Sequence, residues 1–119
     1  MVMVDRLIRA EGTETVTAFM VRPDNVFVED GKMKEPGLIE NMAQTAAAGA
    51  GAGQPDAEPR TGFIGSIRNL LISDLPEVGS EIITRVTVEH AVMNASVVQA
   101  EAKLGENVVA SCEMKIFLM

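Results

Sequence analysis

Apolar and polar residues alternate along much of the C-terminal half of the chain, and this alternation predicts β-strands. Over residues 81–89 one parity carries the residues Ile82, Thr84, Val86 and Val88. Over residues 108–118 the apolar parity is longer: Val108, Ala110, Cys112, Met114, Ile116 and Leu118. Residues 62–73 and 95–103 are also rich in apolar and β-branched residues, and turns at residues 76–79 and 104–107 separate these segments. We therefore expect four consecutive strands joined by short turns.

The N-terminal third carries weaker strand signals. Residues 2–4 are typical of a short strand that leads to Leu7 and Ile8, and β-branched residues dominate residues 13–21. Turn-forming residues at 22–25 end this second strand, and we expect a further loop at residues 29–32. The pattern thus predicts two strands before the next element.

Residues 37–50 give the one convincing helical pattern. Pro36 suits a first helical turn, and Glu40 lies early enough for its carboxylate to favour the helix dipole. One face carries Leu38, Met42, Thr45, Ala46 and Gly49. The remaining positions are mostly alanine, so almost no side of the helix is polar and we expect it to be buried. Glu40 is then a carboxylate on an apolar helix, which is costly to bury unless it is paired or used in chemistry.

Strands that are segregated from a single helix are typical of an α+β domain with an antiparallel sheet. A helix that is apolar on nearly every side needs to be wrapped, and a strongly curved sheet can wrap it. The 119 residues suffice for a self-sufficient core, and no repeat or long linker divides them. We therefore expect one domain over residues 1–119.

The composition narrows the candidate functions. Seventeen acidic residues against ten basic ones give a net charge of −7, and the basic residues are scattered, so we expect no nucleic-acid partner. The chain has no tyrosine or tryptophan, and its core must be built from aliphatic residues and eight methionines. Methionine either fills gaps in an ordinary core or lines a flexible apolar channel.

Cys112 is the only cysteine and His90 the only histidine, so the sequence predicts neither a disulfide framework nor a cysteine- or histidine-rich metal site. We expect no metal and no cofactor. Cys112 has apolar neighbours of its own parity and should pack as a small hydrophobic residue. Charged residues near the N-terminus interrupt the region where an export signal would need an apolar run, and no segment is long enough to span a membrane. We therefore expect a cytoplasmic protein.

Three segments together resemble the 3-hydroxyacyl-ACP dehydratases of the hot-dog fold. They are Val2-Met3-Val4-Asp5-Arg6, Glu40-Asn41-Met42-Ala43-Gln44 on the helix, and Gly62-Phe63-Ile64-Gly65 in a strand. In that family an apolar-Asp-Arg segment opens the domain, and a Pro-Gly followed by Glu-x-Met-Ala-Gln forms the central helix. The resemblance covers nearly the whole chain and implies a curved antiparallel sheet around one helix. It looks closest to a divergent branch of dehydratase-like proteins, some of which serve aryl-polyene-type pigment pathways.

The resemblance also implies a site. The family forms homodimers with active sites along the subunit interface, where the helix glutamate, here Glu40, pairs with a histidine of the neighbouring subunit. A backbone N–H of Gly37 or its neighbour is the candidate donor to the thioester carbonyl. Gln44, Phe63 and Gly65 complete the candidate substrate-binding residues, and the substrate would be an acyl thioester on acyl carrier protein (ACP) or coenzyme A. Gln44, one turn after Glu40, either orients that carboxylate or holds a backbone group of the enclosing sheet.

The histidine of the family is missing. It lies in a His-Phe-Pro-Gly loop before the glutamate, whereas residues 25–31 hold no histidine and His90 lies far along the chain, in or beside a strand. Asn25 and Asp30 are the polar residues nearest the missing histidine. Dehydration needs a base for the C2 proton and an acid for the departing hydroxyl. Either Glu40 performs both tasks or the chemistry differs.

Three functions therefore stay open. The first is dehydration of 3-hydroxyacyl thioesters in fatty-acid or polyene-type biosynthesis. The second is thioester hydrolysis, in which one helix carboxylate activates water and no histidine is needed. The third is not catalytic: the chain would bind acyl thioesters, or complete a dimer with an active relative.

Overall fold

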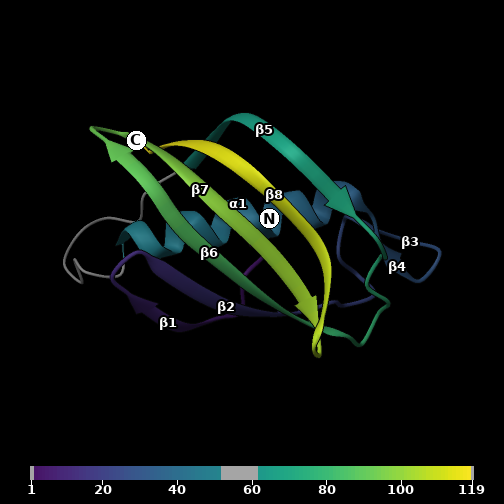
Figure 1. Ribbon diagram of the computed structural model, residues 1–119. Coiled ribbons are helices and arrows are strands. Elements are labelled where there is room, and N and C mark those ends of the chain that lie inside the picture. The colour runs from purple at the N-terminus through teal and green to yellow at the C-terminus, as the bar shows by residue number, and fades with distance from the viewer. Residues whose placement is uncertain (1, 52–61, 119) are drawn as a thin grey trace.

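The computed structural model describes residues 2–51 and 62–118, which form one helix and eight strands (Figure 1). In chain order these are β1 (Arg6–Glu11), β2 (Glu14–Met20), β3 (Val28–Glu29), β4 (Lys32–Met33), α1 (Glu35–Gly51), β5 (Gly62–Ile72), β6 (Glu81–Val92), β7 (Ala95–Leu104) and β8 (Asn107–Leu118). Strands β3 and β4 form a small separate hairpin, and the other six strands form one sheet.

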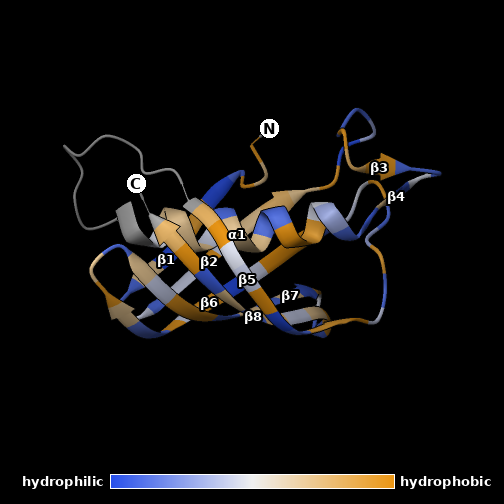
Figure 2. Cartoon of the chain, turned by 90° about the horizontal axis from the view of Figure 1, so that it is seen from above, coloured by the Kyte–Doolittle hydropathy of each residue, from blue (hydrophilic) through white to orange (hydrophobic). Residues whose placement is uncertain are grey.

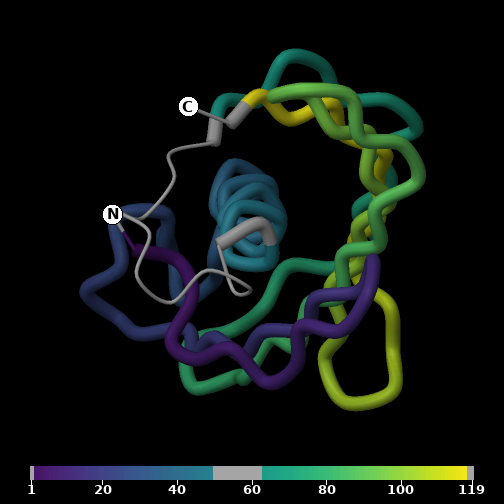
Figure 3. Tube along the Cα trace, turned by 90° about the vertical axis from the view of Figure 1, so that its left-hand side faces the viewer, coloured from purple at the N-terminus to yellow at the C-terminus, as the bar shows by residue number. Residues whose placement is uncertain are grey.

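Every pairing in the six-stranded sheet is antiparallel, and the strand order is β1-β2-β6-β7-β8-β5. After the helix the chain adds β5 at the far edge, and β6, β7 and β8 then fill the space between β2 and β5. Viewed along the helix, the strands curve around α1 (Figure 3). The predicted α+β fold, a curved antiparallel sheet around one central helix, is therefore confirmed.

Helix α1 packs against the concave face of the sheet because its apolar face points inward. Leu38 and Met42 are fully buried, and no residue over 37–49 is exposed. Figure 2 shows hydrophobic residues along much of α1 and the strands beneath it, and hydrophilic ones around the β3–β4 hairpin. Four methionines are fully buried in the core: Met3, Met33, Met42 and Met114. These methionines therefore fill the core, the first of the two roles considered.

A β-bulge explains the one error in the predicted parity of the last strand. The alternation placed Val108 on the buried face, but Val108 is exposed and Val109 is buried. The pairing of β7 with β8 shifts at this point, from Ala102 opposite Ala110 to Lys103 opposite Val108. One extra residue in a strand moves the following side chains to the other face. From Ala110 to Ile116 the predicted parity holds.

The predictions differ from the structure by more than one residue at four places. Residues 2–4 belong to no strand, and β1 begins only at Arg6. The predicted loop at residues 29–32 is the β3–β4 hairpin, whose turn residues Asp30 and Gly31 have φ angles of 54° and 79°. Asp-Gly with two positive φ angles is the favoured two-residue hairpin turn, so this signal was available in the sequence. The helix begins at Glu35 rather than Gly37, with Pro36 inside its first turn, and β6 continues past residue 89.

Candidate active site

A groove of about 200 Å³ lies between helix α1 and the beginning of β5. It is lined by Glu40, Ala43, Gln44, Ala47, Phe63 and Ile64. The four helical residues follow the spacing i, i+3, i+4, i+7, so they share one face of α1. Three predicted site residues, Glu40, Gln44 and Phe63, therefore meet in one place. Glu40 is half-buried rather than enclosed as expected, and among the described lining residues it is the one ionisable side chain.

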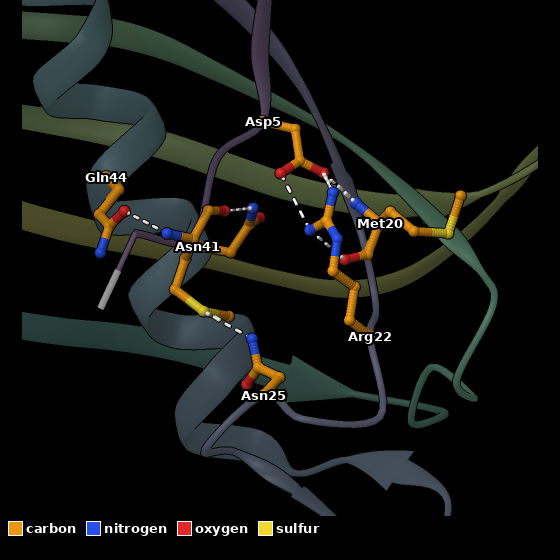
Figure 4. Close-up of polar contacts among 7 residues, drawn as sticks. Asp5, Met20, Arg22, Asn25, Asn41 and Gln44 are labelled. Carbon is orange, nitrogen blue, oxygen red and sulfur yellow. Dashed lines mark hydrogen bonds and ion pairs between the residues drawn. The ribbon is translucent and has the colours of Figure 1, made fainter.

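Gln44 holds the Glu40 carboxylate. Its side-chain Nε2 donates to Glu40 Oε1 at 3.0 Å, across one helical turn. Its Oε1 accepts the backbone N–H of Met3 at 2.6 Å, a contact drawn in Figure 4. The sequence left two roles open for Gln44, and the geometry combines a bond to Glu40 with one to a backbone group. The backbone group belongs to the N-terminal segment rather than to the sheet.

A buried polar cluster on the adjacent face of α1 was missed by the sequence analysis. Asn41 is fully buried; its Nδ2 donates to Met3 O at 2.7 Å, and its Oδ1 accepts the Thr84 hydroxyl at 2.5 Å. Thr45 donates to Asn41 O at 2.8 Å and shares a 2.7 Å hydrogen bond with Thr17. An asparagine three residues after Leu38, at the edge of the predicted buried face, was the available signal.

The N-terminal segment, residues 2–5, is held in place by contacts of Met3 and of Asp5. Met3 is fully buried, and Asp5 accepts the backbone N–H of Met20 at 2.7 Å and both terminal nitrogens of Arg22 at 3.0 Å (Figure 4). Partial burial acts to raise the pKa of Asp5, but the hydrogen bonds from Arg22 and Met20 and the charge of Arg22 together lower it. Asp5 of the apolar-Asp-Arg segment therefore helps to hold Met3 beside the helix.

The structure does not bring Gly37 or Gly65 into the groove. The Gly37 N–H donates to Lys34 O at 2.9 Å, and a Cβ at this position would lie 2.6 Å from Met33 Cγ. Gly65 lies at a register shift of β5, where a Cβ would come within 2.3 Å of the Phe117 ring. Both glycines therefore make room for neighbouring side chains, and the Gly37 N–H is already used within the chain.

The other polar candidates also lie away from the groove. Asn25 is buried, where it donates to Met3 Sδ at 3.3 Å and accepts the Phe27 N–H at 2.8 Å. Asp30 is exposed in the turn between β3 and β4. His90 is exposed and pairs with Val97 in the sheet. None of the three lines the groove that contains Glu40.

Cys112 packs among core residues as predicted, and burial raises the pKa of its thiol to about 11. Within residues 2–51 and 62–118, no group of three or more histidine, cysteine, aspartate or glutamate side chains is arranged to hold a metal ion. No helix in this part of the chain is long and apolar enough to cross a membrane. The cytoplasmic location stays a prediction.

Comparisons with solved structures support the fold. The dehydratase heterocomplex ApeI:P from Xenorhabdus doucetiae has a TM-score of 0.85 at 16% identity, over 98% of this chain and 82% of that chain. Protein PH1136 from Pyrococcus horikoshii has a TM-score of 0.75 at 14% identity, over 99% and 85%. Protein PA5202 from Pseudomonas aeruginosa has a TM-score of 0.73 at 16% identity, over 95% and 86%. At such low identity these similarities show the hot-dog fold alone.

The solved structures show the fold, and a family model shows the family. No curated protein sequence is significantly similar to the chain. The model of the ApeP-like family, described as ApeP dehydratase, matches residues 1–119. Since this match spans the whole sequence, the chain belongs to the ApeP-like dehydratase family.

Proposed function

We propose that this chain is a subunit of a dehydratase that removes water from 3-hydroxyacyl thioesters, with Glu40 as an acid/base group. The observation that carries the proposal is the half-buried Glu40 carboxylate in a groove otherwise lined by apolar residues and one amide. Membership of the ApeP-like dehydratase family supports the reaction class. The thioester would be delivered on ACP or coenzyme A, in fatty-acid or polyene-type biosynthesis.

The reaction needs more than one proton transfer. A base removes the C2 proton, the C2–C3 double bond forms, and the C3 hydroxyl leaves as water after it accepts a proton. The described residues bring one ionisable side chain, Glu40, to the groove. We favour a second group from another subunit, because an acid and a base at separate positions can each hold the protonation state that its step needs.

The β5 edge of the sheet supports association near the candidate site, because residues of β5 line the groove. Strand β1 exposes Leu7 and Ile8 among its charged residues, and it has a register shift between Leu7 and Arg9. Strand β5 exposes four large apolar side chains, Phe63, Ile64, Leu70 and Leu71, and it too has register shifts and a charged residue, Arg68. Because Phe63 and Ile64 also line the groove, a subunit docked on β5 would form a further wall beside Glu40.

The identity of that subunit follows from the missing histidine. A second copy of this chain, the homodimer expected from the resemblance, would bring the same residues, and its only histidine lies on β6, outside the described groove lining. The solved ApeI:P dehydratase is a heterocomplex. We therefore propose a different hot-dog chain with its own acid/base histidine as the partner. Co-expression with such a relative, followed by light scattering, distinguishes the 1:1 heterocomplex from the homodimer.

The catalytic test uses 3-hydroxyacyl-ACP as the substrate, with mass spectrometry to detect the loss of water. Wild-type complex should dehydrate the substrate, and Glu40→Gln should lower the rate by about 10²–10⁴, the usual contribution of a general acid/base. Glu35→Gln is the matched control, because Glu35 is an exposed carboxylate in the first turn of the same helix. Equal rates for wild type and Glu40→Gln would refute the role of Glu40.

Thioester hydrolysis is the alternative that one observation favours. Among the described lining residues Glu40 supplies the single carboxylate, which suits the activation of a water molecule because that step needs one base. Release of free thiol from acyl-ACP or acyl-CoA, measured with a thiol reagent, separates hydrolysis from dehydration directly. If thiol appears and the unsaturated thioester does not, the chain is a hydrolase.

A further inference from the structure

Two partners within the described residues favour one orientation of the Gln44 amide. Its Oε1 accepts the Met3 N–H at 2.6 Å, and its Nε2 donates to Glu40 Oε1 at 3.0 Å. A backbone N–H can only donate and a carboxylate can only accept. Rotating the amide by 180° would therefore place N–H against N–H and oxygen against carboxylate. The Met3 N–H and the Glu40 carboxylate thus both favour the orientation in which Nε2 faces Glu40.

Met3 is itself held firmly. Its carbonyl accepts Asn41 Nδ2 at 2.7 Å, and its side chain is fully buried. Two residues later, Asp5 is bound by Arg22 and by the Met20 N–H, and the Asp5 N–H donates to Ala18 O at 2.9 Å. Contacts to helix α1, to the core and to β2 therefore fix the N–H that faces Gln44 (Figure 4).

We propose that Gln44 is a positioning residue for Glu40, and that the N-terminal segment stabilises the Gln44 orientation through the Met3 N–H. The inference rests on the proposed function, since Gln44 has this role only if Glu40 acts on a substrate in the groove. Gln44 engages one carboxylate oxygen, Oε1, which leaves Oε2 as the oxygen that exchanges protons with the substrate. The glutamine of the helix motif then acts through Glu40.

Two substitutions of Gln44 separate the two hydrogen bonds. Gln44→Met has similar length but removes both the donor and the acceptor. Gln44→Glu keeps an acceptor for the Met3 N–H but replaces the donor to Glu40 with a second carboxylate. Val98→Ala is the control for general destabilisation, because Val98 is a buried residue of β7 outside this hydrogen-bonded chain.

Hydrogen exchange measures the hydrogen bond from the Met3 N–H to Gln44 Oε1 without any need for turnover. In ¹⁵N-labelled protein, the Met3 amide should exchange roughly two- to tenfold faster in Gln44→Met than in wild type, the factor expected for one lost hydrogen bond. In Gln44→Glu the Met3 amide should exchange at close to the wild-type rate. Val98→Ala serves to correct for the change in global stability. Equal Met3 exchange in wild type and Gln44→Met would overturn the inference.

Kinetics of the purified complex test the hydrogen bond from Gln44 Nε2 to Glu40 Oε1. Both Gln44 variants should lower kcat by about tenfold or more, with KM changed less than about twofold, because a misdirected carboxylate weakens proton transfer rather than binding. Val98→Ala should keep the wild-type kcat. If the wild-type complex is active and both Gln44 variants keep its kcat, the positioning role of Gln44 is wrong and the proposed function still stands. An inactive wild-type complex would instead reject the proposed function, and the positioning role with it.

Discussion

Replacing Asn41 with leucine tests the buried polar cluster between helix and sheet. Leucine has the same branching as asparagine but no polar atoms, so the change removes both the donor to Met3 O and the acceptor of the Thr84 hydroxyl. Asn41 and Thr84 are fully buried, and Met3 is as well. The substitution therefore leaves a carbonyl and a hydroxyl in the core without their partners.

The magnitude follows from those two groups. A buried donor or acceptor that loses its partner costs about 1–3 kcal/mol, so Asn41→Leu should lower the free energy of unfolding by about 3–4 kcal/mol. Thr84→Val alone should cost about 1–2 kcal/mol, since it strands only Asn41 Oδ1. In the double variant only the Met3 carbonyl is stranded. The double variant should therefore lose less stability than the sum of the two single variants, by at least about 1 kcal/mol.

Urea unfolding at neutral pH is the assay, with the four proteins at one protomer concentration because association would otherwise change the apparent stability. The m-values should agree within error, since the folded surface is unchanged. Two results would refute the reasoning. One is a loss below about 1 kcal/mol for Asn41→Leu, and the other is simple additivity of the two substitutions.

Three further predictions concern packing, pH and thiol chemistry. Gly49→Ala should destabilise the protein by about 1–3 kcal/mol despite the better helix propensity of alanine, because the new Cβ would lie 1.9 Å from Thr15 Oγ1. Thermal unfolding should show the loss of stability. Adding Thr15→Ala to the same chain should recover much of it. Asp5→Asn should lower stability by less than about 1 kcal/mol at neutral pH, since the pair with Arg22 is partly exposed. The folded pKa of Asp5 lies below its ordinary value of 3.8, so the advantage of wild type is present above pH 3.8 and disappears as the pH falls through the folded pKa; urea titrations at a series of pH values check this, and a difference that persists at the lowest pH would contradict it. Cys112, with a thiol pKa of about 11, should react with iodoacetamide at pH 8 only when urea unfolds the chain, and rapid alkylation of folded protein would show that the thiol is accessible.

The order and type of the larger elements were encoded locally, and the sequence alone was enough to predict them. Alternation over residues 81–89 and 110–116 marks strands because successive side chains of a strand point to opposite faces. The small apolar residues after Gly37 mark a buried helix for an equally local reason. Glu40 stood out because a carboxylate is rare on such a helix, and Gln44 because it lies one turn further along the same face.

Only the tertiary structure decided which atoms meet these residues. Met3 and Gln44 are 41 positions apart, and the hydrogen bond between them exists because residues 2–5 leave the sheet and run beside the helix. No periodicity predicts that contact, and none predicts the extra residue in β8 that turns Val108 outward. Gly37 and Gly65 were assigned to the site from a motif; in the structure a Cβ at Gly37 would meet Met33 and Phe27, and one at Gly65 would meet Phe117 of β8. Local sequence patterns record which face of an element is buried, whereas the partner of each polar atom depends on how separate elements pack.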